Sequence, residues 1–191
     1  MITNGLSPNM RYYIETDRLL MRDLLAADAE GMYELDSDPD VHRYVGRNPV
    51  TTIERSREII DIIRTQYDTN GIGRWAVIEK STGNFIGWSG LKLMTELTNG
   101  HINYLDVGYR FIKRYWGQGY AKETARAAVD YAWHALGAAD VYGMADVENV
   151  ASCKVLESTG MQLIEHFLFE GDMHAWYRLQ RPASLPLSQP K

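Results

Sequence analysis

Apolar residues along the chain recur with helical spacing in some segments and in short strand-like runs in others. A helix is predicted from the capping-box pair Thr51 and Glu54 to a stop at Gly71. One face of this helix is apolar and consists of Ile59, Ile60, Ile63 and Tyr67. Two short helices are expected before it, over residues 29–35 and after Pro39, and a third short helix over 151–158.

A second long helix is predicted from Tyr120 to Leu136, with Gly137 as its stop. Most residues on its apolar stripe are small: Ala121, Ala125, Ala128, Val129, Ala132, Trp133 and Leu136. Because alanine side chains are short, such a helix can lie very close to a sheet, which favours a layered α/β domain.

Strands are predicted wherever short apolar runs lie between turn residues. These runs cover 12–25 (a bent or two-part strand), 75–79, 85–93, 104–112, 141–145, 163–169 and 174–179. The order β-α-α-α-β-β-β-α-β-α-β-β, with no repeat or composition break, predicts one domain over residues 11–181. Residues 1–10 and 182–191 are expected to be loose tails, since both are rich in polar residues or proline.

The composition disfavours several classes of protein but does not identify the function. The 191 residues carry 20 basic and 25 acidic side chains, and this net charge of −5 disfavours general binding to nucleic acid. The absence of a membrane-length apolar stretch and of an export signal predicts a cytoplasmic protein with no membrane partner. The single cysteine, Cys153, excludes an intramolecular disulfide, and the five histidines lack metal-ligand spacing, so no metal is expected.

The most informative segment is Phe111-Ile-Lys-Arg-Tyr-Trp-Gly-Gln-Gly-Tyr-Ala121, where a strand ends and the alanine-striped helix begins. A helix N-terminus presents unpaired N–H groups, and glycine lets the backbone approach an anion closely, so this loop predicts a phosphate or pyrophosphate site. Lys113 and Arg114 supply local positive charge. The alternative is a plain strand-to-helix turn. Lys122 breaks the dinucleotide-binding fingerprint, and the sequence has no P-loop.

Two motifs together resemble the GNAT superfamily of acetyl-coenzyme A-dependent N-acetyltransferases. Arg114-x-x-Gly117-x-Gly119 is similar to the family's first signature, and Asn149-Val-Ala-Ser152, followed by a short helix and Gly160-Met161, is similar to its second. The opening segment 14–22 and the segment 115–121 look like the branch that contains ribosomal-protein N-terminal acetyltransferases. The resemblance implies a single twisted mixed sheet of about seven strands, with helices on both faces and an opening between two parallel strands.

The resemblance also implies a site for acetyl-CoA. Backbone N–H groups in the loop would hold the pyrophosphate, with Arg114 as part of the motif and with Gly117, Gln118, Gly119, Tyr120 and Ala121 as the binding residues. Backbone groups of Phe111 and Ile112 would pair with the pantetheine arm and supply an oxyanion donor. Asn149 would bind the same arm. Its alternative role is to cap the short helix, for which asparagine is among the best residues.

Acetyl transfer requires a neutral amine, and this favours an α-amine acceptor, with a pKa of about 7.7–8.0, over a lysine side chain at about 10.4. Asp106 stands where the branch often has glutamate and is the predicted general base, acting through water because aspartate is shorter. Its alternative role is an ion pair with an arginine. Position 156 is Leu where many members have a tyrosine acid, so Ser152 is the candidate proton donor, with local backbone bonding as its alternative.

Other residues are expected to shape an acceptor slot or to pack in the core. Asp36, Asp38 and Asp40 bracket a helical turn that would roof the slot, as a solvated capping loop or as an attraction for a cationic acceptor. Most of the aromatic residues are expected to pack, while one or two could line the slot: Trp75, Trp88, Tyr104, Tyr109 and Trp176.

The predicted function is transfer of the acetyl group of acetyl-CoA to a primary amine in a ternary complex. The acceptor is a small-molecule or peptide amine, with a protein N-terminus favoured and an amino acid, an aminoglycoside or a polyamine as further candidates. A non-catalytic acyl-CoA-binding module and a nucleotide-binding regulator are the alternatives. Formation of a homodimer is left open.

Overall fold

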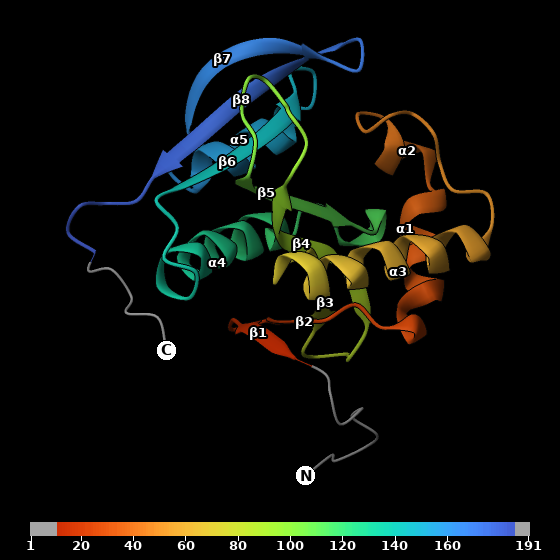
Figure 1. Ribbon diagram of the computed structural model, residues 1–191. Helices are drawn as coiled ribbons and strands as arrows, with labels where there is room; N and C mark the ends of the chain where they lie inside the picture. Colours follow the sequence, from red (N-terminus) through yellow and green to blue (C-terminus); the bar gives the residue numbers. More distant parts are fainter. Residues whose placement is uncertain (1–10, 186–191) are drawn as a thin grey trace.

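One eight-stranded mixed sheet organises residues 11–185, the part of the chain that the computed structural model describes (Figure 1). Its strand order is β1-β2-β3-β4-β5-β6-β8-β7. The strands are β1 (Tyr12–Glu15), β2 (Leu19–Arg22), β3 (Trp75–Glu79), β4 (Phe85–Met94), β5 (Tyr104–Phe111), β6 (Asp140–Asp146), β7 (Gln162–Phe169) and β8 (Asp172–Gln180). The helices are α1 (Ala29–Ser37), α2 (Pro39–His42), α3 (Ile53–Asn70), α4 (Tyr120–His134) and α5 (Val150–Ser158), with short 3-10 turns η1 (Ala26–Asp28) and η2 (Lys113–Tyr115).

The prediction of about seven strands was one too few, because the apolar runs within 12–25 form two antiparallel strands. The charged residues between them make the turn, which is closed by a hydrogen bond from Thr16 N to Leu19 O (2.9 Å). A short charged segment between two apolar runs is compatible both with a bend in one strand and with a turn between two strands. The expected tails 1–10 and 186–191 lie outside the described residues, while 182–185 form a turn whose Leu185 packs against the core.

The two long helices form where the sequence predicts them, but their ends differ: the cap of α3 is Thr52 and not the predicted Thr51. Helix α3 is capped by Thr52, whose hydroxyl accepts the N–H of Arg55 (3.3 Å), and it is followed by Gly71 in the left-handed conformation. In α4, Ala125, Ala128 and Ala132 are fully buried against the sheet. The helix ends at His134, earlier than predicted, and Leu136 beyond it is exposed.

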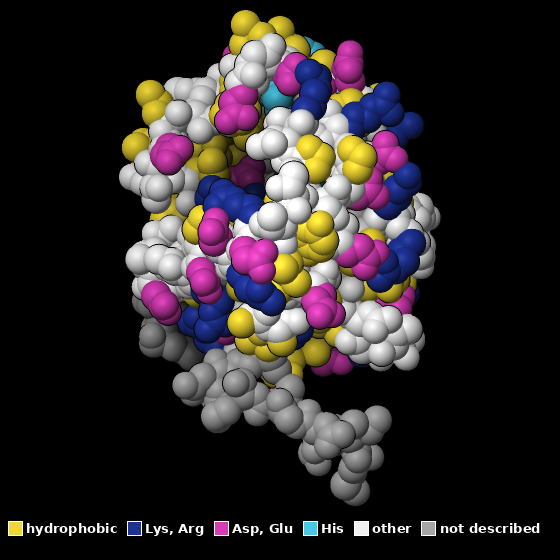
Figure 2. All heavy atoms as spheres, turned by 90° about the vertical axis from the view of Figure 1, so that its right-hand side faces the viewer, with side chains coloured by type: hydrophobic (Ala, Val, Ile, Leu, Met, Phe, Trp, Pro, Cys, Tyr) yellow, Lys and Arg dark blue, Asp and Glu magenta, His cyan; other side chains and the backbone are white. Residues whose placement is uncertain are grey.

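Side chains of β5 alternate between two faces of the sheet that carry different helices. On one face, which we call the α5 face, the Tyr109 hydroxyl donates to Ser152 O on α5 (2.9 Å). On the other, which we call the α1 face, the Arg110 guanidinium donates to Asp36 on α1 (2.7 Å). Figure 2 shows the side of the molecule that carries α1, α2 and α3, hollowed at one place with an acidic side chain in its floor.

The central pair of strands, β5 and β6, is parallel and almost unpaired. Its register contains one residue pair, Asp106 with Tyr142, whereas β4 and β5 share eight registered pairs and β6 and β8 share seven. Residues 108–111 and 144–146 form no registered pair with each other. The sheet therefore has an opening between the C-terminal halves of two neighbouring strands, beside the start of α4.

Gly143 lets α5 pack closely on β6 beside this opening. A Cβ atom at this position would lie 2.8 Å from Leu156 Cδ2, which is closer than packed carbon atoms approach, and 3.3 Å from Val107 Cγ1, which is a tight contact. We predict that Gly143→Ala lowers the free energy of unfolding by about 1–3 kcal/mol, since α5 must shift outward. Denaturant unfolding measures the change, and an unfolding midpoint equal to that of the wild type would contradict this packing.

Candidate active site

The loop between β5 and α4 has the geometry of an anion site. Gly117 and Gly119 have φ angles of +74° and +81°, a region that glycine enters without strain. Gly119 is the N-cap residue of α4, and no side chain caps the helix. The N–H groups of the first turn are therefore available to a ligand, as the sequence predicts for the segment from Gly117 to Ala121.

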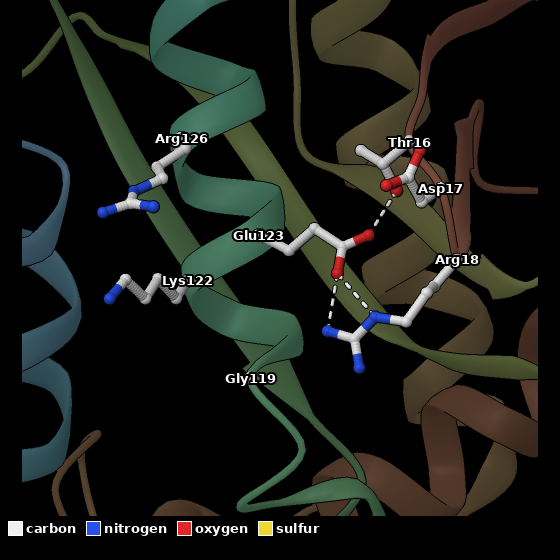
Figure 3. A pocket seen from close by; sticks show the side chains of 7 residues that line it. All are labelled: Thr16, Asp17, Arg18, Gly119, Lys122, Glu123 and Arg126. Atoms are coloured by element: carbon white, nitrogen blue, oxygen red, sulfur yellow. Dashed lines mark hydrogen bonds and ion pairs between the residues drawn. The ribbon is translucent and has the colours of Figure 1, made fainter.

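A cavity of about 530 Å³ adjoins this loop and is lined mainly by charged side chains (Figure 3). Its lining residues are Thr16, Asp17, Arg18, Gly119, Lys122, Glu123 and Arg126. Lys122 and Arg126 extend from α4 in the same direction, away from the ion pair between Arg18 and Glu123. Sequence reasoning missed these two cations, although their spacing of four residues after a glycine loop was a usable signal.

The two cations that the sequence assigned to the anion site have other partners. Lys113 forms an ion pair with Asp40 on α2, and Arg114 forms one with Glu34 on α1. Their positive charges are therefore compensated by carboxylates on α2 and α1. Three further cations, Arg18, Lys122 and Arg126, line the cavity beside the N-terminus of α4, and Arg18 is itself paired with Glu123.

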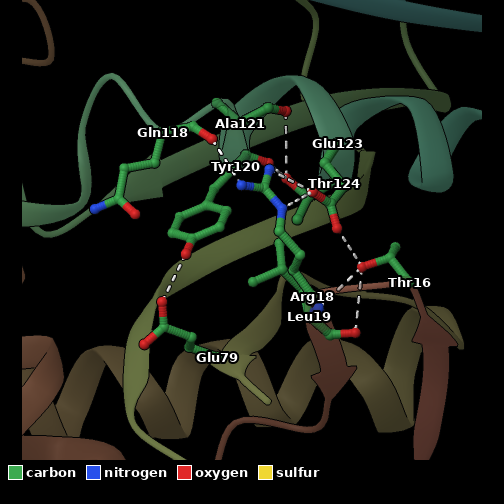
Figure 4. A network of polar contacts seen from close by, with 9 residues as sticks. All are labelled: Thr16, Arg18, Leu19, Glu79, Gln118, Tyr120, Ala121, Glu123 and Thr124. Atoms are coloured by element: carbon green, nitrogen blue, oxygen red, sulfur yellow. Dashed lines mark hydrogen bonds and ion pairs between the residues drawn. The ribbon is translucent and has the colours of Figure 1, made fainter. Parts of the chain in front are cut away.

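A polar network fixes the start of α4 against the β1–β2 turn and β3 (Figure 4). Arg18 donates to Gln118 O (2.9 Å) and to Glu123 Oε2 (2.8 Å), and its guanidinium lies 4.5 Å from the centre of the Tyr120 ring. The Tyr120 hydroxyl donates to Glu79 (2.6 Å), and this bond raises the pKa of Tyr120 and lowers that of Glu79. The loop is thus held in place before any ligand arrives.

Backbone groups at the end of β5 differ in what they can offer a ligand. Ile112 is bonded within the protein at both groups: its N–H donates to Ile86 O (3.0 Å), and its carbonyl accepts from Tyr115 N (2.9 Å). The Phe111 carbonyl accepts from Trp116 Nε1 (2.7 Å). Alternate residues of a strand direct their backbone groups to opposite edges, so the N–H of Phe111 points toward the opening. The backbone of Ile112 therefore cannot bind the ligand in this structure as predicted, because its N–H and carbonyl are already bonded within the protein.

Asp106 lies at the one registered pair of β5 with β6, and it is buried. Its Oδ2 atom accepts from the Arg74 guanidinium, which also donates to the carbonyls of Gly90 and Asp106. Burial raises the pKa of Asp106, and the charge of Arg74 opposes that rise. The ion pair with an arginine was the alternative role considered for Asp106, and the structure contains it. The other carboxylate oxygen, Oδ1, has no hydrogen-bond partner within residues 11–185.

Asn149 and Ser152 lie at the N-terminus of α5, beside the opening. Asn149 Oδ1 accepts the N–H of Ser152 (3.1 Å), which is the helix-capping role, while its amide nitrogen has no partner in the described part of the chain. The Ser152 hydroxyl is 3.1 Å from the Tyr109 hydroxyl. Burial raises the pKa of Tyr109. The sequence placed Tyr109 in a group of aromatic residues of which most were expected to pack and one or two could line the acceptor slot, and no spacing signal connected it with Ser152.

The acids expected to roof a slot each have a partner. Asp36 accepts from Arg110 (2.7 Å) and lies 3.5 Å from His42 Nε2. Asp38 accepts the N–H of Asp40 as the cap of α2. Burial, together with the positive charge of Arg110, lowers the pKa of His42, and the neighbouring Asp36 opposes that shift.

Residues 11–185 contain neither a cluster of metal-ligand side chains nor a helix suited to a membrane span. No group of three or more potential metal-ligand side chains comes together there. None of the helices combines the length and the apolar character needed to cross a membrane.

Comparison with known proteins identifies the family. The family model described as an acetyltransferase (GNAT) domain matches residues 18–162. The "FsC-acetyl coenzyme A-N(2)-transacetylase" of Aspergillus fumigatus is 30% identical over 89% of this chain and 80% of its own length, and the "Uncharacterized N-acetyltransferase p20" of Bacillus licheniformis is 29% identical over 77% and 80%. The structure of a "putative ribosomal-protein-serine acetyltransferase" from Vibrio cholerae superposes with a TM-score of 0.73 at 21% identity, covering 92% of this chain and all of that one.

The glycine loop at the start of α4, the opening between β5 and β6 and the Asn149 segment all fall within or beside that matched range. The predicted fold class is confirmed, and so is the predicted class of enzyme. The chain belongs to the GNAT family and is an acetyl-CoA-dependent N-acetyltransferase.

Proposed function

We propose that this enzyme transfers the acetyl group directly from acetyl-CoA to the α-amine of a peptide or protein N-terminus, with both substrates bound at once. The observation that carries the proposal is the opening between β5 and β6, which begins beside the uncapped N-terminus of α4. An anion held at that helix start would place an attached flexible arm along the free edge of β5. Acetyl-CoA, which has a pyrophosphate joined to an extended amide-containing arm, fits this arrangement.

The chain's own groups would hold acetyl-CoA at three points. Backbone N–H groups from Gly117 to Ala121 would bind the pyrophosphate. The N–H of Phe111 and the neighbouring edge of β5 would pair with the pantetheine arm as with an added strand. The free amide nitrogen of Asn149 would donate to a carbonyl of that arm while Oδ1 continues to cap α5. The two roles considered for Asn149 are therefore compatible.

Bound acetyl-CoA supplies a thioester whose C–S bond breaks as the bond between carbon and the amine nitrogen forms. The amine must be neutral to attack, so its ammonium form must first lose a proton. We assign that proton to the unpartnered Oδ1 of Asp106, reached through a water molecule, because aspartate is too short for direct contact. The proton that the nitrogen loses after the bond has formed passes to solvent and balances the one that the departing sulfur takes up. Arg74 would hold the carboxylate in orientation through Oδ2.

The departing sulfur takes up a proton or leaves as a thiolate. The Ser152 hydroxyl is the candidate donor, since it lies at the N-terminus of α5 and contacts the Tyr109 hydroxyl at 3.1 Å. Tyr109 donates its own proton to Ser152 O (2.9 Å), which leaves the serine proton available for the thiolate. Tyr109 is then a positioning residue for Ser152.

The Gly119→Asp variant tests the proposed binding site for the pyrophosphate at the start of α4. A carboxylate at this position would place negative charge and bulk against the N–H groups of α4, so we predict loss of detectable acetyl-CoA binding in calorimetric titration. The matched control is Gly71→Asp, which introduces the same side chain at a similar φ (+70°) after α3, with no atoms within 4 Å of the new Cβ. Unchanged affinity of Gly119→Asp for acetyl-CoA would contradict the assignment.

The role of Asp106 is tested by the pH dependence of Asp106→Asn. We predict that turnover falls by about a hundredfold at pH 7 and by less at pH 9, where an α-amine has already lost its proton. Acetyl-CoA affinity should change little. Because the variant leaves Arg74 without its counter-charge, it should also lose about 3–5 kcal/mol of stability, so circular dichroism must first establish that it is folded.

Asp106→Glu is the companion variant, because it keeps the negative charge beside Arg74. We expect its pH profile to keep the wild-type shape at a reduced rate. A pH profile of the folded Asp106→Asn protein that matches the wild-type profile would remove Asp106 as the base.

The acceptor class is tested by release of thiol from acetyl-CoA in the presence of short peptides with free N-termini, the same peptides with blocked N-termini, and simple amines. We predict release with the free peptides and none with the blocked ones. Release with the simple amines alone would contradict a peptide acceptor. Binding of acetyl-CoA without release from any amine would contradict the transferase reaction.

A further inference from the structure

Buried carboxylates on the α1 face have arginine partners, with one exception. Asp36 pairs with Arg110, and Asp106 pairs with Arg74. Asp146, the last residue of β6, is 5% exposed, and none of residues 11–185 forms an ion pair with it. Aspartate is almost never this buried without a compensating charge, because transfer of a carboxylate out of water is costly.

The strand register places Asp146 within the opening and on the α1 face. Tyr142 is paired with Asp106, and Met144 packs with Tyr142 in an aromatic cluster on that face, so Asp146 has the same orientation two residues further on. The register of β6 with β8 continues without a shift as far as Asp146 and His174. Asp146 therefore lies four residues beyond the last registered contact of β6 with β5, where the two strands have separated.

Only part of the Asp146 carboxylate has a structural role. Its Oδ1 atom accepts the N–H of Glu148 (2.8 Å) and so stabilises the turn that leads into α5. The second oxygen, Oδ2, has no hydrogen-bond partner within the described residues. An asparagine could form the same turn with its own Oδ1, so the turn alone does not require the negative charge.

Aromatic side chains follow from the residue opposite Asp146 on β8 onto the next strand, β7. His174 lies opposite Asp146 on β8, with its ring centre 5.4 Å from that of Phe169 and 6.2 Å from that of Phe167. Phe167 in turn meets Trp176 edge-on at 5.4 Å. Faces of aromatic rings attract cations, and the attraction is strongest where water is excluded.

From this arrangement we infer that Asp146, with the His174 ring opposite it on β8, forms a subsite for a positively charged group of the acceptor other than the amine that is acetylated. The acceptor class is then an amine that carries a second cationic group. This inference rests on the proposed function, because it places the acceptor on the α1 face of the opening. The phosphates of acetyl-CoA are excluded from the subsite, since a carboxylate repels them.

The test uses two dipeptide amides, alanyl-arginine amide and alanyl-citrulline amide. They have the same shape and the same reactive α-amine, but only the first carries a second charge, and its guanidinium is not acetylated. We expect the wild type to prefer the arginine peptide in kcat/KM, mainly through a lower KM. Asp146→Asn keeps the acceptor oxygen for Glu148 N and removes the charge, and we expect it to reduce that preference at least about tenfold.

The matched control is Asp140→Asn, at the other end of the same face of β6 and roughly 20 Å away. It should leave the preference unchanged. A second readout does not depend on turnover: the N-acetylated arginine peptide, a product analogue, is titrated calorimetrically into the complexes of CoA with wild type and with Asp146→Asn. Tighter binding to the wild type supports the subsite, and equal binding overturns it.

Failure of the inference differs from failure of the proposed function. If neither peptide releases thiol while acetyl-CoA binds, the peptide acceptor is wrong, and the product-analogue titration still decides whether Asp146 binds a cation. If both peptides react and Asp146→Asn retains the wild-type preference for arginine, the proposed function stands and the subsite is refuted.

Discussion

The interaction on which this structure most depends is the buried ion pair between Arg74 and Asp106. An opening in the middle of a sheet requires β5 to stay in position without a partner along one edge. Arg74 adds a buried link between β4 and β5, because its guanidinium donates to the carbonyls of Gly90 on β4 and Asp106 on β5 as well as to the Asp106 carboxylate. Gly108 makes room for the guanidinium, since a Cβ there would lie 2.6 Å from Arg74 Nη2. The strand is thus fixed to β4 at the point where it separates from β6.

Residues of the candidate site lie on both faces of the sheet, on either side of the opening between β5 and β6. The glycine loop, Asn149 and Ser152 belong to segments joined to α4 and α5, and they form the proposed seat of acetyl-CoA. The α1 face of the sheet carries the other group of side chains, which are Asp36, His42, Asp106 and Asp146. The proposed transfer takes place across the opening, where groups from both faces come within reach of one thioester. The acetyl group and the acceptor would then approach from opposite sides.

Most of the fold was predictable from local pattern, because helical periodicity, a threonine cap and a glycine stop coincide in α3, and the spacing of apolar residues marks α4. The reversal between β1 and β2 was not, since the charged turn residues 15–18 are equally compatible with a bend. The glycine loop was found because its chemistry is local: a strand end, two glycines and a helix start. The partners of charged residues could not be found in this way. Arg74 is 32 residues from Asp106, and Glu34 and Asp40 pair with the two cations that the sequence assigned to the anion site.

The central claim is that acetyl-CoA occupies the opening between β5 and β6, with its pyrophosphate at the start of α4. A crystal structure of the complex with coenzyme A tests it most directly. The account predicts pyrophosphate oxygens within hydrogen-bond distance of the N–H groups between Gly117 and Ala121, and a pantetheine arm paired with the edge of β5 at Phe111. Coenzyme A bound elsewhere, or bound with the opening closed by pairing of residues 108–111 with 144–146, would contradict it.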